Sequence, residues 1–78
     1  MPSWDHSAKE TLKTIAKESS ELAIFILGTV NRLEKQPTLG DLALRPDTRY
    51  YSDYEKKFRI SYISKKKIIH ITVITTWK

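Results

Sequence analysis

The residues of this sequence best suited to chemistry are an arginine and a histidine in its last third. Arg59 carries a permanent charge on a planar group that matches the oxygens of a phosphate. His70 belongs to the residue type that exchanges protons near neutral pH. Cleavage of RNA by its own 2′-hydroxyl group needs a proton acceptor, a proton donor and positive charge at the phosphate. The pair therefore predicts phosphate chemistry, with Arg59 at the phosphate and His70 in proton transfer.

Basic and aromatic residues accompany this pair. Residues 56–78 contain seven basic residues and no acidic one, whereas residues 1–40 contain five of each. This asymmetry predicts a polyanionic partner, either nucleic acid or an acidic protein segment. Lysine and arginine bind phosphates, and aromatic rings stack on bases, although at least half of the tyrosines are expected simply to pack in the sheet. The candidates for RNA binding are Arg49, Tyr50, Lys56, Lys57 and Trp77, with Tyr51 and Tyr54 as further rings.

Several kinds of site are excluded by what the sequence lacks. It has no cysteine, so thiolate metal sites and cysteine nucleophiles are impossible. Its two histidines do not stand at metal-ligand spacing, and no glycine-rich phosphate loop or serine-hydrolase motif is present. Neither a signal peptide nor an apolar run long enough to span a membrane is found. We therefore expect a cytoplasmic protein without a metal or another cofactor.

The first half of the chain predicts two helices. Ser7 and Glu10 fit a capping box for a helix over about 8–18. Ser19-Ser20 ends that helix and caps a second one over about 21–35, so the two form an αα-hairpin. We expect Gly28 to allow close packing against a neighbouring element. The buried stripe of the second helix is predicted from its apolar spacing to be Leu22, Ala23, Ile26, Leu27, Val30 and Leu33, widened by Ile24 and Phe25.

The second half predicts strands over about 48–54, 57–64 and 67–76, and a short strand is expected at Pro2–Asp5. With a turn at Lys65-Lys66, Tyr62 would face Ile69, Ile60 would face Ile71, and Phe58 would face Val73. The alternation then sends these residues to the core. The opposite face would carry Arg59, Ser61, His70, Thr72 and Lys78, with Ile63, Ile68 and Ile74 among them.

A chain of 78 residues suffices for one domain, residues 1–78. We expect an α+β fold, in which the N-terminal αα-hairpin packs on one face of a small antiparallel sheet. This sheet has three main strands, and the short N-terminal strand is its possible fourth.

Three stretches of the sequence resemble a known family. They are Trp4-Asp5-His6-Ser7-Ala8 followed by Leu12 and Ile15, then Leu33–Pro37 with Gly40, and finally Lys57–Tyr62 with Ile69-His70-Ile71. Together with the order of the elements, they resemble the RelE/ParE superfamily of toxins from type II toxin–antitoxin pairs. At two positions of the preceding strand where the family has basic residues, this sequence has Tyr50 and Ser52.

The resemblance implies a toxin that a cognate acidic antitoxin holds inactive. RelE-like members cleave mRNA on the ribosome without a metal ion, and ParE-like members poison DNA gyrase. Arg59 matches the family's arginine at the scissile phosphate, and Lys78 falls near a second basic position after the last strand. With His70, these are the predicted catalytic residues.

Alternatives to the ribosome-dependent endoribonuclease stay open. Many RelE-like members carry a tyrosine in a C-terminal helix, and YoeB-like members end in a His-Tyr pair. This sequence has neither feature, and Thr76-Trp77 stands roughly in the place of that pair. A ParE-like gyrase inhibitor, or a degenerate toxin that only binds its antitoxin, is therefore retained. A small nucleic-acid-binding domain is the third reading. The sequence does not decide between a monomer and a homodimer.

Overall fold

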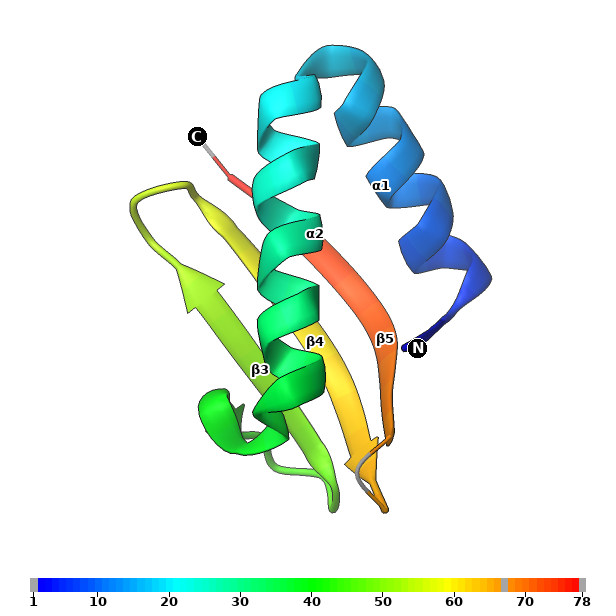
Figure 1. Ribbon diagram of the computed structural model, residues 1–78, viewed down its shortest axis with the longest axis vertical. Coiled ribbons are helices and arrows are strands. Elements are labelled where there is room, and N and C mark those ends of the chain that lie inside the picture. Colours follow the sequence, from blue (N-terminus) through cyan, green and yellow to red (C-terminus); the bar gives the residue numbers. More distant parts are fainter. Residues whose placement is uncertain (1, 67, 78) are drawn as a thin grey trace.

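The computed structural model describes residues 2–66 and 68–77, and it has two helices packed on one face of a five-stranded sheet (Figure 1). The strands lie in the order β1-β5-β4-β3-β2; β1 runs parallel to β5, and the other neighbours are antiparallel. The predicted α+β class, αα-hairpin and short N-terminal strand are confirmed. The elements are β1 (Ser3–Trp4), α1 (His6–Glu18), α2 (Ser20–Lys35), the 3-10 helix η1 (Pro37–Leu39), β2 (Asp41–Leu42), β3 (Thr48–Asp53), β4 (Phe58–Lys65) and β5 (Ile68–Thr76).

The first helix begins earlier than its predicted capping box. Its N-cap residue is Asp5, so the prediction that Ser7 caps this helix is wrong. The Asp5 N–H donates to the Ile71 carbonyl over 2.8 Å, and its own carbonyl accepts from the Lys9 N–H over 3.0 Å. The chain therefore passes from β1 into α1 without a loop.

The second helix begins at the predicted cap, because the Ser19 Oγ accepts a hydrogen bond from the Leu22 N–H over 3.2 Å. Its buried residues form a narrower stripe than predicted. Ile24, Phe25 and Leu27 are 68%, 40% and 44% exposed, so their placement in the core was wrong. Gly28 was also expected at a close contact, yet a Cβ there would meet nothing within 4 Å. The buried residues are Ala23, Ile26, Thr29, Val30 and Leu33.

The predicted register of the last hairpin is wrong in two respects. Strand β4 continues through Lys65, which pairs with Ile68, so Tyr62 lies opposite Ile71 and not Ile69. A β-bulge then leaves Thr72 without a direct partner, because Tyr62 pairs with Ile71 and Ser61 with Val73. Beyond the bulge, Ile60 pairs with Ile74 and Phe58 with Thr76.

The bulge exchanges the two faces of the C-terminal half of β5. Ile69 and Ile71 point into the core as predicted, but after the extra residue it is Ile74, 5% exposed, that enters the core. Val73, predicted to be buried, is 50% exposed. The core between helices and sheet is completed by the fully buried Phe58, Ile60 and Tyr62.

The connection between helices and sheet is held by one buried hydroxyl group. Tyr62 Oη donates to the Pro37 carbonyl over 2.7 Å and accepts from the Gly40 N–H over 3.1 Å. The approach is so close that a Cβ at Gly40 would lie 2.6 Å from Tyr62 Oη and 2.7 Å from the Tyr50 carbonyl oxygen. Arg49 strengthens this connection, because its Nη1 donates to the Gly40 carbonyl over 2.8 Å.

The buried Tyr62 hydroxyl predicts that the fold loses stability at alkaline pH. Burial raises the pKa of the Tyr62 hydroxyl above its ordinary value of 10.0, against the opposing effect of the bond from Gly40. Above pH 10 the unfolded chain loses this proton while the folded chain keeps it. The free energy of unfolding should therefore fall by up to about 1.4 kcal/mol per pH unit from this group.

Denaturant unfolding of wild type and Tyr62→Phe between pH 7 and 11 measures this effect. At pH 7 the variant should be less stable by about 1–3 kcal/mol, because the buried partners of the hydroxyl lose their bonds. Its alkaline decline should also be shallower than that of wild type. Parallel declines would contradict the assignment.

Candidate nucleic-acid interface

The sheet face opposite the helices is not covered by any described element (Figure 1). Alternation along β4 sends Phe58, Ile60 and Tyr62 into the core, and it leaves Arg59, Ser61 and Ile63 half-buried on the other face. This bare face, as we call it, therefore carries Arg59 as predicted.

Arg59 is held by two side chains of the neighbouring strand β3. Its Nε donates to Ser52 Oγ over 2.7 Å, and Ser52 is its direct cross-strand partner. Its guanidinium carbon lies 4.9 Å from the centre of the Tyr50 ring, within the range of a cation–π contact. The hydrogen bond uses Nε alone, so both Nη groups have no hydrogen-bond partner among the described residues. A planar cation fixed at Nε can offer both Nη groups to one phosphate.

A small hollow lies beside this arginine. It has a volume of about 210 Å³ and is lined by Tyr54, Arg59, Thr75 and Trp77. The rings of Tyr54 and Trp77 are tilted by 57° with their centres 6.0 Å apart. The backbone N–H of Trp77 donates to the Lys57 carbonyl over 3.2 Å. This bond anchors the chain after β5 to the turn between β3 and β4. An aromatic hollow beside a cation with two free donor groups suits a nucleobase next to its phosphate.

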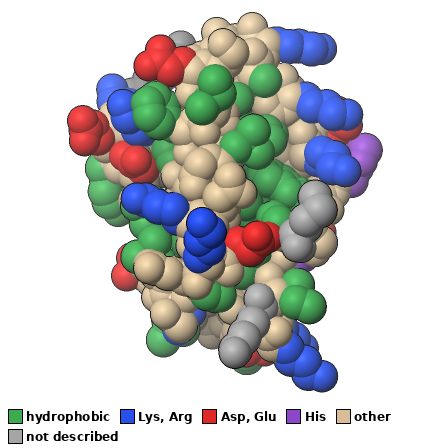
Figure 2. All heavy atoms as spheres, viewed as in Figure 1, with side chains coloured by type: hydrophobic (Ala, Val, Ile, Leu, Met, Phe, Trp, Pro, Cys, Tyr) green, Lys and Arg blue, Asp and Glu red, His purple; other side chains and the backbone are tan. Residues whose placement is uncertain are grey.

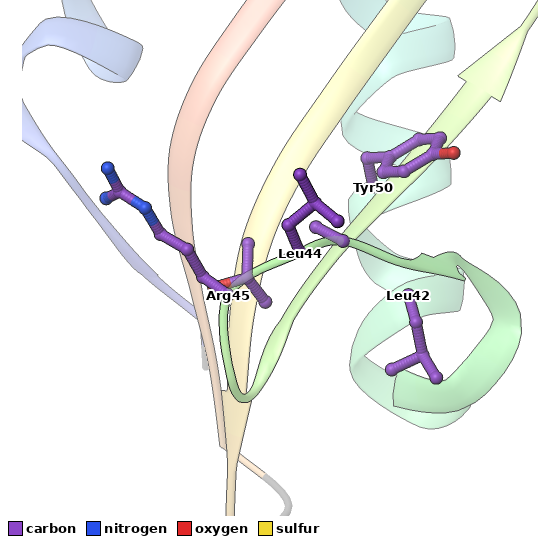
Figure 3. Close-up of a pocket in the computed structure, with 6 residues that line it drawn as sticks. Leu42, Leu44, Arg45 and Tyr50 are labelled. Carbon is purple, nitrogen blue, oxygen red and sulfur yellow. The ribbon is translucent and has the colours of Figure 1, made fainter.

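A second hollow of about 530 Å³ lies where the connection from β2 to β3 meets the sheet (Figure 3). Tyr50 lines it and also contacts Arg59, so the two hollows flank the Tyr50–Arg59 pair. Leu44 is fully exposed here, and the Arg45 side chain extends away from the loop. The other lining residues are Leu42, Ala43 and Thr48.

The remaining basic candidates do not gather at Arg59. Arg49 lies opposite the core residue Tyr62 and binds the carbonyl of Gly40. Lys56 points to the helices, with its Nζ 4.1 Å from the centre of the Phe25 ring. Lys57 occupies the β3–β4 turn, where its φ of 65° lies in the left-handed region. Lys78 lies outside the described residues.

His70 also lies apart from Arg59. The predicted register, with Tyr62 opposite Ile69, would put His70 one residue pair from Arg59. This is wrong, because His70 pairs with Ile63 while Arg59 pairs with Thr75. The His70 ring lies between two residues at the start of the chain: Nδ1 is 2.5 Å from Ser3 Oγ, and Nε2 is 2.5 Å from Asp5 Oδ1. These contacts tie β1 and the start of α1 to β5. The catalytic role of His70 stays a prediction.

Ser52 and Thr75 belong to the site in the structure, although neither was predicted from the sequence. Tyr54, which was predicted only as a further aromatic ring, lines the hollow beside Arg59. Pairing between β3 and β4 brings Ser52 to Arg59, and no register between these two strands was predicted from the sequence. Thr75 reaches the same face only because of the bulge at Thr72.

Within residues 2–66 and 68–77 there is no cluster of three potential metal ligands. None of the described helices has the length and apolar character needed to cross a membrane.

The contacts of His70 predict a structural effect of its removal. His70→Ala eliminates both ring contacts and should lower the free energy of unfolding by about 1–2 kcal/mol. His6→Ala is the matched control, since the His6 side chain is 87% exposed and its nearest acidic atom is 3.9 Å away. Denaturant unfolding measures both variants. Equal stability of the two would contradict the tying role of His70.

Comparisons with known proteins identify the fold. No family model and no curated protein sequence matches the chain. Among solved structures, the isolated RelE toxin of E. coli matches all of this chain and 84% of its own, with a TM-score of 0.84 and 12% sequence identity. A chain of the intact E. coli RelBE toxin–antitoxin complex matches all of this chain over 96% of its own length, with a TM-score of 0.84 and 11% identity. The chain therefore has the RelE fold, as the sequence resemblance predicted.

Proposed function

We propose that this chain is the toxin of a type II toxin–antitoxin pair, and that it acts as a RelE-like, metal-independent endoribonuclease on mRNA at the ribosome. The observation that carries the proposal is the fixed guanidinium group of Arg59 beside the hollow of Tyr54 and Trp77 on the bare face. The RelE fold supports the toxin proposal. The assignment of Arg59 to the scissile phosphate rests on the sequence resemblance.

In the proposed reaction the 2′-hydroxyl of RNA gives its proton to water, and its oxygen attacks the adjacent phosphorus to form a 2′,3′-cyclic phosphate. The bond from phosphorus to the 5′-oxygen breaks, and the 5′-oxygen leaves with a proton taken from water. Negative charge grows on the phosphate oxygens during this step, and the Nη groups of Arg59 are placed to stabilise it. Ser52 and Tyr50 hold the guanidinium group in place before RNA binds, so the Arg59 side chain loses little further conformational freedom on binding. Lys78, which directly follows Trp77 in the sequence, is proposed as a second cation at this phosphate.

The two hollows define how RNA would lie. We place one base against Tyr54 and Trp77 and the neighbouring nucleotide in the hollow beside Tyr50, with the phosphate between them at Arg59. The proposal gives His70 no part in the reaction, because Ser3 and Asp5 bind it at another part of the sheet. Lys57 serves as an outer contact to RNA phosphates, whereas Lys56, at the Phe25 ring, and Arg49, at the Gly40 carbonyl, serve mainly the fold.

The proposed partner in the resting cell is an acidic antitoxin. The RelE neighbour is found in a toxin–antitoxin complex, and the net charge of +5 of this chain favours an acidic segment. The proposed place of action is the cytoplasm. A non-catalytic role, as a gyrase inhibitor or an antitoxin binder, is the second candidate. It is favoured by one observation: the described residues that line the Arg59 hollow include no histidine or carboxylate for proton transfer.

Substitution of Arg59 distinguishes the endoribonuclease from the non-catalytic function. Arg59→Ala should reduce mRNA cleavage by about 10²–10³-fold, the usual loss on removing one donor at developing charge. Arg59→Lys should fall between wild type and this variant, because an ammonium group keeps the charge without the planar pair of donors. Controlled expression in cells, followed by growth curves and mapping of transcript ends, measures the effect.

Arg32→Ala is the matched control for this experiment. It removes the same charge from α2, where Arg32 contacts Tyr51 away from the hollow. Growth arrest that persists in Arg59→Ala with intact transcripts would reject the endoribonuclease and leave the non-catalytic function. Absence of growth arrest from the wild-type protein, expressed alone and shown to be folded, would reject the toxin proposal.

Trp77 and Tyr54 should contribute base stacking. Trp77→Ala or Tyr54→Ala should weaken binding of a short single-stranded RNA by about 1–3 kcal/mol, and Trp77→Phe should retain most of the affinity. Fluorescence anisotropy of a labelled oligonucleotide measures the affinity. RNA should also quench the tryptophan emission of wild type but not that of Trp77→Phe, in which Trp4 is the remaining tryptophan. Quenching that survives in Trp77→Phe would contradict this binding site.

A further inference from the structure

The outward face of α2 is an unpartnered surface that the proposed function does not use. Three large apolar side chains of this helix are exposed, Ile24 at 68%, Leu27 at 44% and Phe25 at 40%. Figure 2 looks onto this face, and green side chains gather there over the helices. Clustered apolar groups on a small protein mark an interaction surface.

The spacing of the exposed residues defines a straight seam along the helix. Glu21, Ile24, Gly28, Asn31 and Lys35 follow one another at intervals of three and four, and all are exposed. Such spacing keeps residues on one side of a helix, here the side opposite to the buried stripe. Phe25 and Leu27 flank this seam. A partner helix would therefore lie along α2.

Gly28 shows how closely that partner would approach. Glycine weakens a helix relative to alanine, and nothing inside this chain requires it here. Its φ is not positive, and a Cβ would meet nothing within 4 Å. A glycine that packs against nothing in its own chain leaves a gap in the middle of the seam. The gap lets a second helix come near the backbone, between the exposed apolar side chains.

Two copies of the seam are complementary in charge when they run in opposite directions. Gly28 lies seven residues from Glu21 and seven residues from Lys35. In an antiparallel pair of α2 helices centred on Gly28, Glu21 of each copy meets Lys35 of the other. A parallel pair would place like charges together, and a uniformly acidic partner would meet Glu21.

We propose that this face binds a second copy of the chain, through antiparallel packing of α2 against α2 about a two-fold axis at Gly28. Such an isologous contact uses the same patch on both copies. It leaves the bare face open, because the helices and Arg59 lie on opposite sides of the sheet. The patch is small, so a concentration-dependent dimer is expected.

Sedimentation equilibrium of the full chain, at concentrations up to about 1 mM, tests the proposal. Wild type should show a monomer–dimer equilibrium. Gly28→Gln fills the gap with a good helix former, so it should raise the dimer dissociation constant at least tenfold without unfolding the monomer. Thermal unfolding followed by circular dichroism verifies the monomer of each variant.

A charge exchange identifies the orientation. Glu21→Lys alone and Lys35→Glu alone each create two like-charged contacts and should weaken the dimer, whereas the double variant should restore it. Glu18→Lys, which makes the same charge change outside the seam, should leave the equilibrium near wild type. A wild-type monomer at every concentration would overturn the proposal. A dimer that is indifferent to Gly28→Gln and to the charge exchange would overturn it too, because its contact would lie elsewhere.

Discussion

One extra residue in β5 decides what both faces of the sheet contain. Without the bulge at Thr72, strict alternation would carry Val73 into the core and leave Ile74 outside. The bulge reverses this order, so Ile74 fills the core and Thr75 reaches the bare face beside Arg59. Trp77 lines the same hollow. The hydrophobic core and the candidate RNA site therefore depend on a single irregularity, which the Thr72 hydroxyl supports by donating to the Ser61 carbonyl over 3.1 Å.

The sequence was sufficient for the elements and for part of the site. Helical spacing, turn residues and β-branched runs predicted both helices and the three long strands to within a few residues. Alternation within β4 placed Arg59 on the uncovered face. The bulge could not be predicted in the same way, because Val73 and Ile74 are both apolar and either would fit the core. For the same reason Ile24, Phe25 and Leu27 were assigned to the interior on their apolar character alone.

Polar residues explain the other differences between expectation and structure. Arg49 and His70 were candidates for RNA chemistry because of their residue types, yet each binds a short segment at one edge of the sheet. Arg49 holds the start of β2, and His70 holds β1 and the start of α1. Exposed sheet edges invite pairing with other chains, and two short strands shield them here. A sequence does not show which of its cations hold an edge and which remain available to a ligand.

The position of β5 has a consequence for synthesis. The last strand of the chain lies between β1 and β4, so the first residues cannot find their neighbours until the last ones exist. A ribosome makes the chain from its N-terminus, and contacts between distant residues form late in folding. A growing chain would therefore complete its sheet, and the hollow beside Arg59, only after β5 and Trp77 have been made.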